Sequence, residues 1–322
     1  MQTQGGTSRQ INRWTGRTRG GYLGNWIFVN LLRVGGPWLG YFLLVPVTFY
    51  YLLFASQAVK ASQTYLRRLG YKLESGFERW WLAYKHFYSF GQTLLDRIAI
   101  IAGNASRYAF VFEGQHHIET ALAEGKGVLI ISAHFGNWQA AAHLLGTLNV
   151  PVHIVAYDNE VAPINQLFAE ALKKRLFSVI SLDNDSASLE IITALRRGEI
   201  VAMHADRSIG DKHSVRLNFL GFPANFPSGP YTVAALSGAP LIHTFAVRRQ
   251  VCSYHLYAYP PQHLAFGSRQ DRPKQLEQWV SSFVERLEAH LKSYPLQWYN
   301  FYEFWEGPLS PSSLRKGHLG KE

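Results

Sequence analysis

A regular alternation of short apolar runs and longer helical patterns constrains this chain more than any other feature. Apolar runs bounded by Gly or polar residues are typical of buried strands, and apolar positions three and four residues apart are typical of helices. These patterns predict strands at 110–113, 127–132, 150–157, 177–182, 199–204, 213–220, 240–248 and 251–259. They predict helices within 58–103 and at 117–124, 137–146, 161–174, 185–197, 230–237 and 273–293, with a Pro/Gly-rich loop at 221–230. Such alternation predicts an α/β fold: a mostly parallel central sheet with helices on both faces.

The N-terminal quarter of the chain carries nearly all of its excess charge. The 322 residues have a formal net charge of +10, yet residues 1–73 contain nine Lys or Arg and no Asp or Glu. A charge-free apolar and aromatic stretch, residues 34–59, lies within this basic region. Basic residues beside a long apolar segment are typical of attachment to an anionic membrane surface, where each contributes about 1 kcal/mol. A nucleic-acid partner is not expected, because the sequence contains no recognisable reader motif.

The apolar segment at 37–55 adds an N-terminal membrane-associated helical segment to the predicted fold. It is just long enough to cross a bilayer, which needs about 20 residues. Gly40 and Pro46 interrupt it, and both flanks are basic, so the charge rule gives no orientation. Three interpretations are open: a helix embedded in one interface, which we favour, a transmembrane span, and a buried core helix.

The composition divides the chain into three regions. Residues 1–60 are a basic tail and a membrane-associated apolar helix, 61–310 an α/β domain, and 311–322 a flexible C-terminal tail. The single cysteine, Cys252, excludes an intramolecular disulfide. We therefore expect the protein to work on the reducing, cytoplasmic side of a membrane.

Chemistry-bearing residues follow the apolar strand at 127–132. Ser132-Ala133-His134 ends this strand, and a helical pattern begins near Asn137, the predicted N-cap. A histidine at the C-terminal end of a strand lies where open α/β sheets bind ligands. Free amides at a helix start can hold an anion. A core histidine in a strand-to-helix loop is an equally simple interpretation.

A second polar block, Met-His-Ala-Asp-Arg at 203–207, closes the strand at 199–204 in the same way. In a parallel sheet this block would lie at the same edge as His134. The spacing of the histidines and of Asp206 matches no known metal signature, so no metal is expected.

Four blocks together resemble the lysophospholipid acyltransferase superfamily, in the branch of bacterial lipid A (lauroyl/myristoyl) acyltransferases and its predicted-acyltransferase subgroup. They lie in matching order at 132–138, 203–207, 218–230 and 297–305. The resemblance covers roughly residues 30–305 and implies an acyltransferase domain at 61–310. It implies a thioester donor, acyl carrier protein or acyl-CoA, a lipid acceptor, no cofactor, and a place at the cytoplasmic face of the bacterial inner membrane.

The first block departs from the family's pattern, which is His followed five residues later by Asp or Glu. Here that position is Gln139. The resemblance implies His134 as the general base, with the acid orienting the imidazole and stabilising its charged form. Gln139 can accept a hydrogen bond but brings no negative charge, and replacing the acid by its amide costs triads roughly 10⁴ in rate. Either Asp206 supplies the charge instead, or the chain is a catalytically weak or inactive lipid-binding relative.

Further residues are candidates for substrate binding. Asn137 is expected to position substrate, and Arg207 to bind the carrier phosphate or an acceptor carboxylate, or to pair with Asp206. Ser228 and Gly229 could present amides to a phosphate or an oxyanion, although a plain turn before a helix explains them equally well. Three other cations are candidates for contacts with phosphopantetheine or the CoA nucleotide: Arg216, Arg248 and Arg249.

The sequence thus predicts a membrane-bound acyltransferase that moves an acyl chain to a hydroxyl or amine of a lipid-linked acceptor. The acceptor could be a glycolipid, a lysophospholipid, an aminoacyl lipid or a polyene pigment head group. A thioesterase-like hydrolase and a non-catalytic lipid-binding protein are the alternatives.

Overall fold

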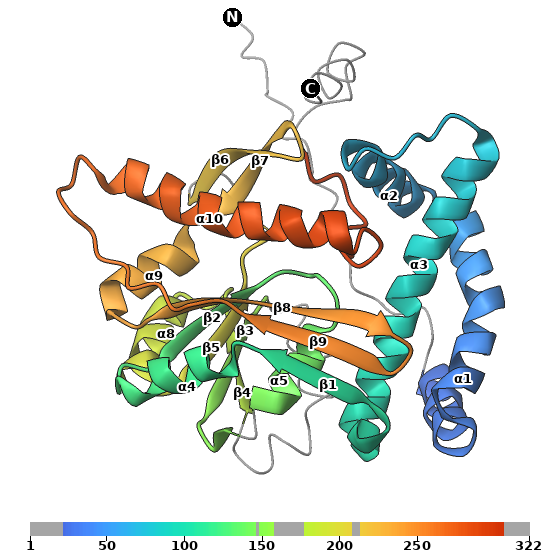
Figure 1. Ribbon diagram of the computed structural model, residues 1–322, viewed down its shortest axis with the longest axis horizontal. Coiled ribbons are helices and arrows are strands. Elements are labelled where there is room, and N and C mark those ends of the chain that lie inside the picture. The colour runs from blue at the N-terminus through green and yellow to red at the C-terminus, as the bar shows by residue number, and fades with distance from the viewer. Residues whose placement is uncertain (1–21, 146–147, 158–176, 208–212, 306–322) are drawn as a thin grey trace, which may run out of the picture.

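The computed structural model describes residues 22–145, 148–157, 177–207 and 213–305. Within them, seven strands form a central sheet in the order β1-β9-β8-β2-β5-β3-β4 (Figure 1). These strands are β1 (Ala109–Glu113), β2 (Val128–Ser132), β3 (Val152–Ala156), β4 (Phe177–Ser181), β5 (Ile200–His204), β8 (Leu241–Gln250) and β9 (Ser253–Ala258). Neighbouring strands pair in parallel except for β8 and β9, which are antiparallel. The predicted α/β class with a mostly parallel sheet is confirmed.

Helices cover both faces of the sheet, with α10 on one side and α5 on the other (Figure 1). The helix predicted at 161–174 lies outside the described residues. The described helices are α1 (Tyr22–Phe54), α2 (Ser56–Arg68), α3 (Gly76–Ala99), α4 (Gln115–Ala123), α5 (Trp138–Leu145), α8 (Ala187–Arg196), α9 (Gly229–Ser237) and α10 (Arg272–Ser293), with short π and 3-10 turns at Ile100–Asn104 and Ala105–Arg107.

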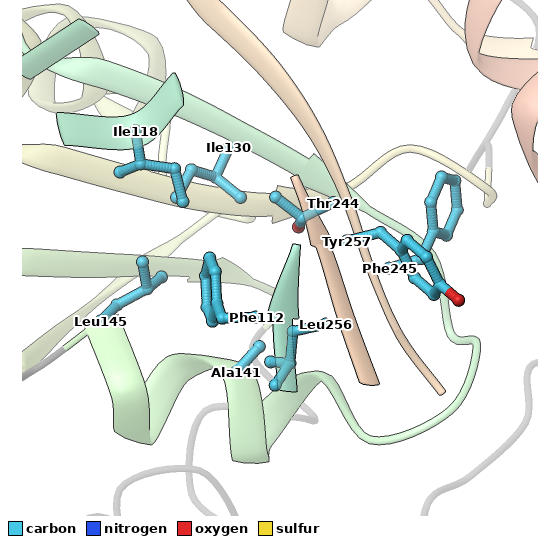
Figure 2. Close-up of a pocket in the computed structure, with 9 residues that line it drawn as sticks. All are labelled: Phe112, Ile118, Ile130, Ala141, Leu145, Thr244, Phe245, Leu256 and Tyr257. Carbon is cyan, nitrogen blue, oxygen red and sulfur yellow. The ribbon is translucent and has the colours of Figure 1, made fainter. Parts of the chain in front are cut away.

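Strand β2 lies at the centre of the sheet, and all five of its residues are buried. Because successive side chains of a strand point to opposite faces, Leu129 and Ile131 pack in the cluster that contains α8, α9 and α10. Val128 and Ile130 pack in the cluster beneath α4 and α5. Figure 2 shows an apolar cavity on this second side, between α4, α5 and the sheet, with a volume of about 20 Å³. A cavity of this size holds about one water molecule, so this layer is close-packed.

The prediction of a loop at 221–230 is wrong, because residues Phe222–Pro227 form strand β7. This strand pairs antiparallel with β6 (Ser214–Phe219) in a separate two-stranded sheet packed against α10. The two residues between the strands, Leu220 and Gly221, have φ values of 51° and 81°. A type I′ turn needs positive φ at both of these positions. The prolines of β7 are tolerated because a two-stranded sheet consists of edge strands.

The N-terminal helices form a layer at one end of the molecule, where α1 and α3 pack side by side (Figure 1). The apolar part of α1, Pro37–Phe54, has a mean hydropathy of 1.5, and only 28% of it is buried. This low burial argues against the core-helix interpretation. The domain boundary predicted at residue 60 falls inside α2, and the tail predicted at 311–322 lies outside the described residues.

The region predicted to be helical, 58–103, contains two main helices, α2 and α3, which residues 69–75 separate. Ser75 and Glu78 form a capping box that starts α3, each side chain hydrogen bonding to the other residue's backbone N–H at 3.0 Å. Farther along α3, His86 is fully buried and bonds Ser62 of α2 at 2.8 Å. Its Nε2 lies 2.9 Å from the carbonyl oxygen of Trp298, so α3 holds the C-terminal segment in place.

Three buried histidines are expected to make the fold sensitive to acid. Burial lowers the pKa of His86 and His290 to about 4 and that of His243 to about 3. In the unfolded chain these groups bind protons near pH 6.5, so the unfolded state binds more protons as the pH falls. The contribution of these neutral histidines to the free energy of unfolding is therefore fully present above pH 6.5 and is lost as the pH falls toward 4. Each histidine lowers the free energy of unfolding by up to about 1.4 kcal/mol for each pH unit.

Urea unfolding followed by tryptophan fluorescence at pH 7.5 and 5.5 measures this effect. The free energy of unfolding should be several kcal/mol lower at pH 5.5. His290→Gln should reduce the pH dependence by about a third, since one of the three titrating groups is removed. Equal stability at both pH values would contradict the prediction.

Candidate functional site

The two polar blocks meet at the carboxyl edge of the sheet. Strands β2 and β5 are parallel neighbours, and their last residues, Ser132 and His204, are paired in register. The chain leaves both strands at the same edge, so His134 and Asp206 lie next to each other, each two residues beyond its strand. Sequence reasoning anticipated this juxtaposition from the positions of the blocks in parallel strands.

His134 and Asp206 form a hydrogen-bonded pair. Nδ1 of His134 lies 2.8 Å from Oδ1 of Asp206, and the backbone N–H of His134 donates to Oδ2 at 3.0 Å. The carboxylate is 1% exposed and the imidazole 18% exposed. Asp206 is thus almost completely removed from solvent, while one part of the ring remains accessible.

Asp206 is ionised despite its burial. Burial acts to raise its pKa, but the adjacent His134, together with Arg207 and His204, lowers the pKa well below its usual range. An ionised carboxylate only accepts hydrogen bonds, so Nδ1 of His134 is the donor. The unprotonated nitrogen of the neutral ring is then Nε2, the atom that a general base would use.

Trp298 is the part of the site that sequence reasoning missed as a functional residue. Its indole Nε1 donates to Oδ2 of Asp206 at 2.9 Å, and its side chain is fully buried. The next residue, Tyr299, donates its backbone N–H to the carbonyl oxygen of His134 at 3.0 Å. The aromatic block at 297–305 marked this region in the sequence, but nothing in it indicated a contact 92 residues away.

Two further rings surround the imidazole. The His204 ring lies with its centroid 4.1 Å from that of His134. Trp138, the first residue of α5, packs edge-on against His204 with a centroid distance of 4.9 Å. These contacts restrict the orientation of the rings at the edge of the sheet.

A tight connection links β2 to α5. Gly136 has φ +62°, and its N–H donates to the carbonyl oxygen of Gln297 at 2.7 Å. Asn137 donates its backbone N–H to Ala246 at 2.8 Å, and its Oδ1 accepts from the N–H of Ala140 at 3.2 Å. The predicted N-cap is confirmed. The Asn137 side chain is fully buried, and its described contacts hold the start of the helix.

The remaining candidates have different surroundings. Nη2 of Arg207 donates to the carbonyl oxygen of Tyr299 at 3.3 Å, beside the pair. Ser228 is buried before α9, where its N–H donates to His213 at 2.9 Å and its carbonyl accepts from Thr232. In the described part of the chain, no hydrogen bond joins Ser228 or Gly229 to the His134–Asp206 pair. Gln139 lies in the first turn of α5, and its side chain is outside the described residues.

The arrangement can accept and return a proton. A histidine whose Nδ1 is held by a buried carboxylate is the base–orienter unit of acyl-transfer enzymes. Within the described residues, no group of three or more His, Cys, Asp or Glu side chains is arranged to hold a metal ion.

Comparison with known proteins gives consistent results. A family model described as bacterial lipid A biosynthesis acyltransferase matches residues 69–306, a range that contains the whole site. Phosphatidylinositol mannoside acyltransferases are similar to the chain: that of Mycobacterium tuberculosis H37Rv is 25% identical over 207 residues, and that of Mycolicibacterium smegmatis 23% over 208. The match covers 63% of this chain and 62% and 64% of these relatives, so the chain spans just under two thirds of their length.

The close approach at Gly136 gives a testable prediction. A Cβ at this position would lie 1.7 Å from the carbonyl oxygen of Ala246, a backbone atom that cannot move away cheaply. Gly136→Ala should therefore lower the free energy of unfolding by more than about 2 kcal/mol and displace His134. Gly221→Ala is the matched control: its φ is also positive, but nothing lies within 4 Å. It should cost about 1 kcal/mol, from backbone strain alone. Equal losses in chemical denaturation would show that the contact with Ala246 is unimportant.

Proposed function

Because the chain belongs to the bacterial lipid A biosynthesis acyltransferase family, we propose that it transfers an acyl chain from an acyl thioester to a hydroxyl or amine of a lipid-linked acceptor. The observation that carries this proposal is the hydrogen bond between His134 Nδ1 and the buried, ionised Asp206. The relatives' names, phosphatidylinositol mannoside acyltransferases, support a lipid-linked acceptor.

His134 acts as the general base in this proposal. The acceptor O–H or N–H attacks the thioester carbonyl, its proton passes to Nε2 of His134, and a tetrahedral oxyanion forms. When this intermediate collapses, the C–S bond breaks and the thiolate takes the proton back from His134. The products are an ester or amide and a free thiol, and no covalent enzyme intermediate or redox step is needed.

Asp206 takes the place of the acid that the family pattern puts at residue 139. Its hydrogen bond fixes the Nδ1–H tautomer, and its charge stabilises the imidazolium that forms during attack. Gln139, on α5, has no catalytic part in this proposal. We assign Arg207, which lies beside the pair, to a phosphate of the donor or an anionic group of the acceptor. Asn137 keeps the start of α5 in position, and Ser228 and Gly229 remain candidates for binding substrate through their amides.

The donor is an acyl carrier protein or acyl-CoA. Both present the acyl group as a thioester on phosphopantetheine, so the chemistry at His134 is the same for either. The net charge of +10 favours both donors, because each is anionic.

The helix α1 attaches the enzyme to the membrane in this proposal, at the cytoplasmic face of the bacterial inner membrane. Its apolar part exposes large side chains, among them Trp38 at 67%, Phe42 at 71% and Phe54 at 64%. Aromatic residues of this kind are favoured at the membrane–water interface. The proposal leaves open whether the helix lies in the interface or spans the bilayer, since 18 apolar residues suffice for either.

A catalytically weak, lipid-binding relative is the second candidate, and the replacement of the family's acid by Gln139 is the observation that favours it. A third outcome, hydrolysis of the thioester, would use the same base with water as the acceptor. Labelled acyl carrier protein and a lipid extract separate the three functions. Acyl transfer to lipid, release of free fatty acid, and liposome binding without turnover are distinct results.

Substitutions of the pair test the mechanism directly. His134→Ala should reduce the rate of transfer from labelled acyl carrier protein by 10²–10⁴, the usual contribution of a general base. Asp206→Asn should cost roughly 10⁴, because the amide no longer selects the Nδ1–H tautomer or stabilises the imidazolium. Ser186→Ala, a change at the half-buried N-cap of α8, is the control for general losses of protein or activity during preparation. If Asp206→Asn is as active as the parent, Asp206 is not the compensating acid.

Substitutions on α1 test the membrane attachment. Trp38→Ser with Phe42→Ser should weaken binding to liposomes at least tenfold, because each large apolar side chain contributes about 1.5–3 kcal/mol on burial. Leu189→Ser is the matched control, since Leu189 is 68% exposed on α8, away from α1. Co-sedimentation with vesicles measures the effect. Equal binding by the double variant and the control would contradict a role of this face in attachment.

A further inference from the structure

A basic surface groove lies between α3, the end of β8 and the chain after α10. Its volume is about 400 Å³. Its polar lining includes Lys85, Ser89, Gln92, Arg248, Arg249 and Gln297, and none of its lining residues is acidic. Three cations without a carboxylate in the lining make this a site of concentrated positive charge.

Arg248 is held firmly in the floor of this groove. Its backbone N–H donates to Oε1 of Gln297 at 2.8 Å, and its carbonyl accepts from Nε2 of the same side chain at 2.8 Å. Its guanidinium donates to Oγ of Ser89 at 3.2 Å, a neutral partner. The nearby carboxylate of Asp96 is already occupied by hydrogen bonds from Tyr41, Tyr108 and Tyr254. The guanidinium lines the groove and feels the charge of Asp96, but among the described residues no carboxylate forms an ion pair with it, so it can still donate to an anion in the groove.

The other polar groups complement this arginine. Nη1 of Arg249 donates to the hydroxyl of Tyr294 at 2.9 Å, which positions a second guanidinium at the rim. Lys85 and Ser89 are four residues apart on α3 and so lie on the same face of that helix. Two guanidinium groups, an ammonium and a hydroxyl form a donor set suited to a phosphate ester.

The groove lies beside the apolar part of α1. Tyr88, another lining residue, donates its hydroxyl to the carbonyl oxygen of Tyr41 at 3.0 Å. Tyr41 is four residues from Pro37, the start of the apolar segment, a distance of about 6 Å along a helix. The groove is thus near an end of the segment that meets the membrane, where lipid phosphates are found.

The groove is also joined to the active site. The backbone oxygen of Gln297 accepts from Gly136, and the next residue, Trp298, donates to Asp206. We propose that this groove binds the phosphate of an anionic glycerophospholipid and thereby seats the enzyme on the membrane beside the His134–Asp206 pair. This inference rests on the proposed function only in placing the enzyme at a membrane. Phosphate binding in the groove does not depend on acyl transfer.

Lipid binding by the full-length protein in detergent micelles tests this proposal. Native mass spectrometry would count bound dioctanoyl phosphatidylglycerol, with dioctanoylglycerol as the same amphiphile lacking phosphate, and with CoA and inorganic phosphate as soluble competitors. Phosphatidylglycerol should bind and dioctanoylglycerol should not. Arg248→Gln with Arg249→Gln should weaken this binding about tenfold or more.

Two controls keep the test independent of folding and of catalysis. Lys85→Gln with Arg249→Gln changes two side chains without touching Arg248 and should also weaken binding severalfold, while Arg196→Gln on α8 should not. His134→Ala should bind phosphatidylglycerol like the parent even if it is inactive, so failure of the catalytic proposal would not be mistaken for failure of this one. Unchanged binding in both double variants would overturn the phosphate site, and displacement of the lipid by CoA would overturn its assignment to a lipid.

Discussion

The buried carboxylate of Asp206 is the group on which the rest of the site depends. Removing a charge from water costs several kcal/mol unless hydrogen bonds and an opposite charge replace the solvent. Here three donors do so: the backbone and ring of His134 and the indole of Trp298. Both His134 donors lie after β2, the indole belongs to the C-terminal segment of residues 295–305, and Asp206 itself follows β5. Because each donor also orients its own residue, the interactions that keep Asp206 ionised also set the tautomer and direction of the imidazole.

The position of Trp298 explains why distant parts of the chain matter for this edge of the sheet. Its ring packs edge-on against Tyr65 of α2 and Phe219 of β6, with centroid distances of 5.0 and 5.4 Å. Its carbonyl oxygen lies 2.9 Å from Nε2 of His86 on α3. The same α3 carries the basic groove and packs against the apolar α1. Helix α3, which packs against the apolar α1, is thus in direct contact with the residue whose indole binds Asp206.

Most of the fold follows from local sequence patterns, and the failures have physical causes. Strand β2 was predictable because it is fully buried and almost uniformly apolar, and its parallel pairing with the mostly buried β5 places His134 and Asp206 at one edge. Strand β7 was missed because Pro223 and Pro227 suggest a loop, while the deciding feature is the positive φ of Leu220 and Gly221. The contact of Trp298 with Asp206 could not be predicted, since no periodicity or spacing encodes a pairing between segments so far apart.

The departure at Gln139 shows the difference between a sequence motif and the geometry that it serves. In the triad arrangement, a carboxylate at Nδ1 orients the histidine and stabilises its charged form, whichever segment supplies that carboxylate. The family pattern puts an acid at residue 139 on α5, whereas the acid that lies at Nδ1 here follows the neighbouring strand β5. Here the strand supplies it at 2.8 Å, buried and ionised. Because the hydrogen bonds of the pair form without residue 139, a neutral amide at that position is compatible with a working pair.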